Sequence, residues 1–198
     1  MRRVCVFSGS NIGVRPEYRE AARELGRLMA ARGIGLVYGG ASIGLMGAIA
    51  DAALEAGGEV IGVIPRSLFK QEVAHAGLSD LYETGSMHER KARMAELSDG
   101  FIALPGGFGT FDELFEIVTW SQIGIHNKPI GVLNVADYFA PLFALVAHAS
   151  REGFIRPVHT EILLREAEPL RLLERLEQYS PPGYSDKWTE LPPERQPD

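Results

Sequence analysis

The sequence is poor in cysteine, since Cys5 is the only one among its 198 residues. No intramolecular disulfide can therefore form, and we expect a reducing, cytoplasmic compartment for this chain. Cys5 lies in the apolar run Val4–Phe7, where a small core residue is a better expectation than a nucleophile.

Two classes of binding partner are disfavoured by what the chain lacks. Its 26 acidic and 20 basic residues give a formal net charge of −6, which argues against a general nucleic-acid or membrane-surface binder. No apolar run is long enough to span a bilayer. We expect the first strand to begin by about Arg3, which leaves no room for a signal peptide.

Several catalytic signatures are also missing. No Gly-Lys-Ser/Thr follows the glycines of the segment 106–109, which excludes a Walker P-loop, and Asp112 occupies the third glycine position of G-x-G-x-x-G. No G-x-S-x-G elbow of a serine hydrolase is present. The histidines show no metal-ligand spacing, so we expect no metal site; they are His75, His88, His126, His148 and His159.

What is present is a regular alternation of apolar strands and helices. This pattern predicts an α/β protein with a Rossmann-like, doubly wound parallel sheet and helices on both faces. We expect one domain over residues 1–179 and a proline-rich tail over residues 180–198. The expected strands are Arg3–Phe7, Gly35–Tyr38, Val60–Ile64, Leu81–Thr84, Phe101–Leu104 and Pro129–Leu133, and the expected helices are Pro16–Ala31, Leu45–Glu55, Ser86–Leu97, Thr110–Ile123, Tyr138–Arg151 and Pro169–Gln178.

Three loops rich in small residues follow strands at 8–11, 39–44 and 106–110. Because ligands bind beyond the carboxyl ends of parallel strands, we expect all three loops at one edge of the sheet. The loop at 39–44 could seat a sugar or phosphate, or it could simply allow a strand and a helix to pack closely.

The segment Leu104–Glu113 is the most informative stretch of the chain, because an apolar strand runs through glycines into a helix that carries carboxylates. Glycines let backbone N–H groups approach a phosphate, and helix N-termini attract anions. Glu113 then places a carboxylate about one helical turn away. A phosphorylated substrate with an acid or base beside it is the expectation; a tight turn capped by Thr110 is the alternative.

A second cluster, Met87–Met94, places Arg90 on the apolar side of a helix. A guanidinium there could grip phosphate or ribose oxygens in a fixed geometry. The alternative, a solvated basic face paired with Glu89 and Glu96, is favoured for Arg93 and remains open for Arg90 and Lys91.

Together these residues resemble the LONELY GUY family of cytokinin riboside 5'-monophosphate phosphoribohydrolases. The resemblance covers roughly residues 3–178 and rests on two paired signatures, Arg90-Lys91 and Pro105–Glu113, with support from the segments 6–10, 37–47 and 119–129. It implies hydrolysis of an N-glycosidic bond in a nucleoside 5'-monophosphate, without a cofactor, by a homodimer with the helix around Trp120 as a candidate contact.

Carried over position by position, the resemblance implies that Arg90 and Glu113 are catalytic. The substrate contacts that it implies are Glu72, Arg90, Lys91, Gly107, Phe108, Gly109, Thr110, Phe111, Asp112, Glu113 and Thr119. Two positions depart from the family pattern, because Ala41 replaces a glycine and Asp112 replaces a glutamate. A nucleotide or molybdenum-cofactor carrier without turnover is the main rival hypothesis, and a lysine decarboxylase is a third.

Overall fold

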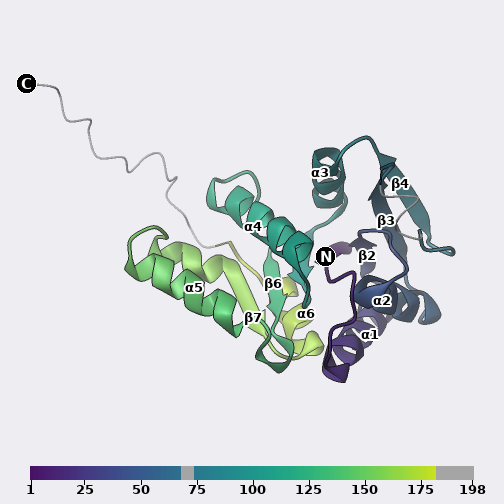
Figure 1. Ribbon diagram of the computed structural model, residues 1–198, viewed down its shortest axis with the longest axis horizontal. Coiled ribbons are helices and arrows are strands. Elements are labelled where there is room, and N and C mark those ends of the chain that lie inside the picture. Colours follow the sequence, from purple (N-terminus) through teal and green to yellow (C-terminus); the bar gives the residue numbers. More distant parts are fainter. Residues whose placement is uncertain (68–73, 182–198) are drawn as a thin grey trace, which may run out of the picture.

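A seven-stranded, all-parallel sheet forms the centre of the molecule (Figure 1). The computed structural model describes residues 1–67 and 74–181. The strand order is β4-β3-β2-β1-β5-β6-β7. The strands are β1 (Arg3–Phe7), β2 (Gly35–Tyr38), β3 (Val60–Pro65), β4 (Asp80–Thr84), β5 (Gly100–Ala103), β6 (Ile130–Leu133) and β7 (Leu163–Glu166).

Helices cover both faces of this sheet, as the alternating pattern predicts. One apolar cluster packs one face of the sheet against the first two helices and the last helix of the chain (Figure 1). A second apolar cluster packs the opposite face against the three helices between them. The helices are α1 (Pro16–Ala31), α2 (Gly44–Glu55), α3 (Met87–Leu97), α4 (Phe108–Gln122), α5 (Ala140–Arg151) and α6 (Pro169–Glu177), with short 3-10 turns at Val135–Asp137 and Pro157–Ile162.

Side chains of the central strands alternate between the two clusters. Val4 and Val6 pack on the side of α1 and α2, whereas Cys5 and Phe7 pack on the side of α3 and α4. Cys5 is fully buried, and this burial raises the pKa of its thiol. The expectation of a core cysteine is therefore confirmed.

The chain reverses its direction across the sheet between β1 and β5. From β1 it winds outward through β2, β3 and β4, and α3 then returns it to the other side of β1. The loops after β1 and β5 therefore open side by side, and the Gly9 N–H donates a hydrogen bond of 3.0 Å to the Pro105 carbonyl. Such a switch point is where doubly wound sheets bind ligands.

The structure departs from the predicted elements in a few places. Helix α4 begins at Phe108 rather than Thr110. Helix α5 begins at Ala140 rather than Tyr138, after a 3-10 turn in which Ala136 and Asp137 adopt positive φ angles of 48° and 59°. The edge strand β7 was not predicted, because its apolar run is short.

The predicted tail 180–198 falls almost entirely outside the described residues, which also leave out residues 68–73 between β3 and β4. Within the described ranges, no helix is long and apolar enough to cross a membrane.

Candidate active site

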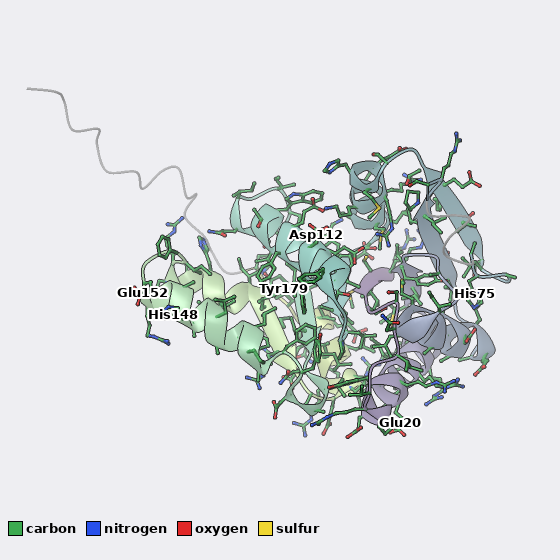
Figure 2. The ribbon with its side chains drawn as sticks, viewed as in Figure 1. Glu20, His75, Asp112, His148, Glu152 and Tyr179 are labelled. Atoms are coloured by element: carbon green, nitrogen blue, oxygen red, sulfur yellow. The ribbon has the colours of Figure 1, made fainter. Side chains whose placement is uncertain are left out.

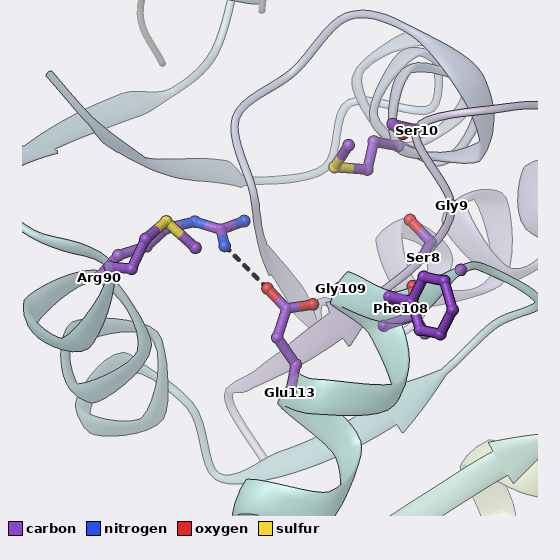
Figure 3. Close-up of a pocket in the computed structure, with 11 residues that line it drawn as sticks. Ser8, Gly9, Ser10, Arg90, Phe108, Gly109 and Glu113 are labelled. Atoms are coloured by element: carbon purple, nitrogen blue, oxygen red, sulfur yellow. Dashed lines mark hydrogen bonds and ion pairs between the residues drawn. The ribbon is translucent and has the colours of Figure 1, made fainter. Parts of the chain in front are cut away.

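A cavity of about 230 Å³ opens at the carboxyl ends of β1 and β5 (Figure 3). Its wall brings together the loop after β1, the first turn of α4 and side chains from α2 and α3. The lining residues are Ser8, Gly9, Ser10, Met46, Met87, Arg90, Gly107, Phe108, Gly109, Thr110 and Glu113.

The N-terminus of α4 contributes backbone to this cavity. Gly107 is the N-cap residue and offers no side-chain cap, and the Phe111 N–H is bonded to the Gly107 carbonyl at 3.1 Å. The N–H groups that precede Phe111 in the first turn lack an intrahelical acceptor, so this end attracts anions. A Cβ atom at Gly107 or Gly109 would meet no protein atom within 4 Å. Protein packing does not require glycine at either position, whereas close approach of a ligand to the backbone would.

The loop that leads into α4 is held from both sides. The Tyr138 hydroxyl donates a short hydrogen bond to the Gly106 carbonyl, and the buried Thr110 hydroxyl lies where a Cβ atom of Gly106 would stand. Gly106 is therefore a packing glycine, in contrast to Gly107 and Gly109. These contacts fix the direction in which the first turn of α4 points.

Arg90 reaches the cavity from the second turn of α3. Ser86 caps this helix by accepting a 3.1 Å hydrogen bond from the Glu89 N–H, and the Glu89 carboxylate accepts one from the Gly85 N–H at 2.7 Å. The Arg90 side chain is buried, and its Nε donates to the Val63 carbonyl at 3.0 Å.

The guanidinium of Arg90 is paired with Glu113. Its Nη1 donates to Glu113 Oε1 at 2.8 Å (Figure 3). Each of the two side chains is only 10% exposed. The backbone at Gly39 passes so close to Arg90 Nη2 that a Cβ atom there would clash with it. This glycine therefore makes room for the buried guanidinium.

Burial raises the pKa of the Glu113 carboxyl above its usual value, although the charge and the hydrogen bond of Arg90 oppose the rise. Glu113 is in the second turn of α4, where the effect of the helix dipole has largely fallen off. Arg90, rather than the helix N-terminus, is therefore the main group that favours the ionised form.

A second, outer pair of contacts joins the same two helices. Lys91 Nζ lies 3.2 Å from Asp112 Oδ2 and 2.9 Å from Glu116 Oε1. Burial lowers the pKa of Lys91, but its hydrogen bonds with Glu116 and Asp112 outweigh this effect and raise the pKa overall. Asp112 lies on the surface of α4 (Figure 2). The α3–α4 contact thus has an inner ion pair and an outer one.

Comparison with known proteins places this chain in a family. A family profile described as "Possible lysine decarboxylase" matches residues 46–176. The probable cytokinin riboside 5'-monophosphate phosphoribohydrolase LOGL9 of Oryza sativa subsp. japonica is 51% identical over 91% of this chain and 79% of its own length. The cytokinin riboside 5'-monophosphate phosphoribohydrolase LOG3 of Arabidopsis thaliana is 46% identical over 91% of this chain and 84% of its own. The chain belongs to this LONELY GUY family.

Solved structures with the same fold are more distant in sequence. The molybdenum cofactor binding protein of Rippkaea orientalis superposes with a TM-score of 0.67 at 22% identity and covers 89% of this chain and 95% of its own. A Moco carrier protein from Chlamydomonas reinhardtii gives a TM-score of 0.66 at the same identity and coverage. At this level of identity the likeness concerns the LONELY GUY fold alone.

The structure brings together six of the residues implied by the LONELY GUY signatures, and these line the cavity: Arg90, Gly107, Phe108, Gly109, Thr110 and Glu113. Four others lie outside the cavity lining: Lys91, Phe111, Asp112 and Thr119. The Thr119 hydroxyl donates to the Phe115 carbonyl at 2.7 Å and is exposed. Glu72 lies outside the described residues. The substrate contacts of all these residues remain predictions.

Five lining residues were not among the predicted site residues, namely Ser8, Gly9, Ser10, Met46 and Met87. Sequence analysis placed the loop after β1 at the correct edge of the sheet, but nothing local to residues 8–10 marked it as adjacent to β5. The strand order of the LONELY GUY fold supplies that adjacency.

The loop at 39–44, which could have been a ligand seat or a packing device, packs closely against its neighbours. Gly44 has a φ of +63°, and a Cβ atom there would collide with the Ser10 backbone. Among the residues that the structure describes, no group of three or more His, Cys, Asp or Glu side chains could hold a metal ion.

Two substitutions at Glu113 separate its charge from its hydrogen bond. Glu113→Gln removes the counter-charge of the buried guanidinium but keeps an acceptor oxygen for Arg90 Nη1. Glu113→Ala removes both, so we expect it to lose about 3–5 kcal/mol of unfolding free energy and the Gln variant to lose less. Urea unfolding of the three proteins measures both losses, and a Gln variant as stable as the unaltered protein would contradict the charge pair as a source of stability.

Proposed function

We propose that this chain hydrolyses the N-glycosidic bond of cytokinin riboside 5'-monophosphates, and of AMP, in the cytoplasm. The products are the free base and ribose 5-phosphate. The observation that carries the proposal is the buried Arg90–Glu113 pair beside an uncapped helix N-terminus in one cavity. The named relatives, at 46–51% identity over most of the chain, support the same reaction.

The first turn of α4 binds the 5'-phosphate in this proposal. Backbone N–H groups at Gly107–Thr110 point their positive end at the anion, and the bare glycines let the phosphate approach the backbone. Binding the phosphate here places the ribose beside Glu113, because the carboxylate follows one turn later on the same helix. Met46 and Met87 add apolar surface that suits a purine base.

Glu113 acts at the sugar carbon. As the bond from C1' to the base nitrogen breaks, positive charge grows on the ribose ring, and a buried carboxylate stabilises that charge. A water oxygen then bonds to C1', and the proton it loses balances the one gained by the departing base. The raised pKa of Glu113 makes its carboxylate a better proton acceptor for this water. Arg90 keeps the carboxylate oriented toward the cavity.

The description "Possible lysine decarboxylase" fits the described residues less well. A pyridoxal-phosphate enzyme needs a lysine amine inside its cavity to hold the cofactor. The two lysines in the described ranges are committed elsewhere, since Lys91 pairs with α4 carboxylates and Lys128 Nζ donates to the Ala95 carbonyl at 2.8 Å. Neither lines the cavity that holds Arg90 and Glu113.

We also propose a homodimer that forms through α4. This helix and the turn after it expose apolar side chains at Phe115, Ile123 and Ile125, while Trp120 is only partly covered. The exposed Thr119 lies beyond the cavity of its own chain, so it could contact substrate only in a second copy.

Turnover tests the roles of the ion pair directly. Glu113→Gln should lower release of adenine from AMP by about 10²–10⁴-fold, because the amide cannot carry the charge or accept the proton. Arg90→Ala should lower release as strongly, because Glu113 loses the group that orients its carboxylate. Chromatographic measurement of free base from AMP and from isopentenyladenosine monophosphate provides the data. The exposed Glu20→Gln on α1 is the matched control (Figure 2). Near-normal release by Glu113→Gln would remove this residue from the mechanism.

The pH profile tests the environment of Glu113. The pKa of Glu113 in the folded protein is raised above that of an ordinary glutamate. As the pH is lowered, kcat/KM should therefore begin to decrease at a higher pH than an ordinary glutamate would give, because the needed carboxylate becomes protonated. The charge of Asp112 raises this pKa and that of Lys91 lowers it. Asp112→Asn should therefore move the acidic limb to lower pH, and Lys91→Gln should move it to higher pH. If the acidic limb of the kcat/KM profile stays at the same pH in both variants as in the unaltered protein, it reports the titration of another group, such as the substrate phosphate.

Light scattering tests the dimer. The unaltered protein at micromolar concentration should give twice the chain mass of 21.7 kDa. Phe115→Glu places a charge in the proposed contact and should give the mass of one chain. Leu145→Glu, at an exposed position on α5, is the control and should leave the mass unchanged. A single-chain mass for the unaltered protein contradicts the homodimer.

A further inference from the structure

Ser8 is a buried serine with an uncommitted hydroxyl. Ser8 is the first residue after β1, and it is only 8% exposed. Its Oγ has no hydrogen-bond partner within the described part of the chain. A buried hydroxyl without a partner costs free energy, and native proteins rarely retain one without a reason. Ser98, which is also buried, shows the ordinary case, since its hydroxyl donates to the Met94 carbonyl at 2.9 Å.

The position of Ser8 points to a ligand. It lines the same cavity as Arg90, Glu113 and the first turn of α4 (Figure 3). Ser8 comes from the end of strand β1, whereas Arg90 and Glu113 come from helices α3 and α4. Its backbone is held on both sides, because the Phe7 carbonyl accepts from the Leu104 N–H at 2.9 Å and the Gly9 N–H donates to Pro105. The hydroxyl is therefore a pre-positioned donor in the cavity wall.

Of the other polar side chains of the cavity, Arg90 is bonded to the Val63 carbonyl and to Glu113, Thr110 packs against Gly106, and Ser10 is exposed. Ser8 therefore offers an entering substrate a buried side-chain hydroxyl that has no partner in the described part of the chain. A nucleotide offers acceptor oxygens in its phosphate and in its ribose, and both parts must lie near α4 if Glu113 is to reach C1'.

We propose that Ser8 is a substrate-contacting residue whose hydroxyl donates a hydrogen bond to an oxygen of the ribose 5-phosphate part of the nucleotide. This inference rests on the proposed function. Because the hydroxyl bonds to substrate and not to protein, its removal should weaken binding and turnover without weakening the fold. A purely structural serine would behave in the opposite way.

The variant Ser8→Ala tests this with two readouts. We expect kcat/KM for AMP to fall about 10- to 100-fold, as for a hydrogen bond to a charged or transition-state oxygen. The urea midpoint should equal or exceed that of the unaltered protein. Ser98→Ala, the matched control, should lower the midpoint and leave kcat/KM unchanged. An unchanged kcat/KM for Ser8→Ala, or a drop in midpoint like that of Ser98→Ala, overturns the proposal.

Inhibition distinguishes the two possible oxygens. If Ser8 contacts the phosphate, Ser8→Ala should weaken competitive inhibition by both inorganic phosphate and ribose 5-phosphate. If it contacts a ribose oxygen, only inhibition by ribose 5-phosphate should weaken. Unchanged inhibition by both overturns the proposal. Absence of base release by the unaltered protein would instead refute the hydrolase function, whereas normal release by both proteins refutes the role of Ser8 alone.

Discussion

The buried ion pair between Arg90 and Glu113 is the interaction on which the site depends. It joins α3 and α4, two helices whose preceding strands lie four places apart in the sheet. The pair can form only because the chain runs outward to β4 and returns through α3 to the far side of β1. Fold topology and site chemistry are therefore linked through a single 2.8 Å contact.

That contact also sets an electrostatic balance. Burial pushes the Glu113 carboxyl toward its neutral form, and Arg90 draws it back toward the charged form. A carboxylate in this state is held ready to meet positive charge, because little water competes for it. The outer pairing of Lys91 with Asp112 and Glu116 surrounds the inner pair and adds charges of both signs close to it.

Much of the fold, and part of the candidate site, could be predicted from the local pattern of apolar, polar and glycine residues in the sequence. The core strands were predictable because each is a short apolar run that ends at glycine, proline or a polar residue. The edge strand β7 was not, since only Leu163 and Leu164 are buried before Arg165 turns outward. The glycine loop at 106–109 was recognisable from one continuous stretch of the sequence. The place of Ser8 in the cavity was not, because it depends on the pairing of β1 with β5, two strands that are far apart in the sequence. Thr119 carried a family signature, but helix geometry places it two turns beyond Glu113.

The glycines at the start of α4 carry a final consequence. Gly106 is required by packing, whereas Gly107 and Gly109 face open space, so the fold itself does not constrain the latter two. If these two glycines bind the phosphate as proposed, ligand binding is the constraint that keeps them. A lineage that lost the reaction would keep Gly106 and let Gly107 and Gly109 drift. The contrast between these neighbouring glycines thus offers a sequence criterion for separating active members of the family from inactive ones.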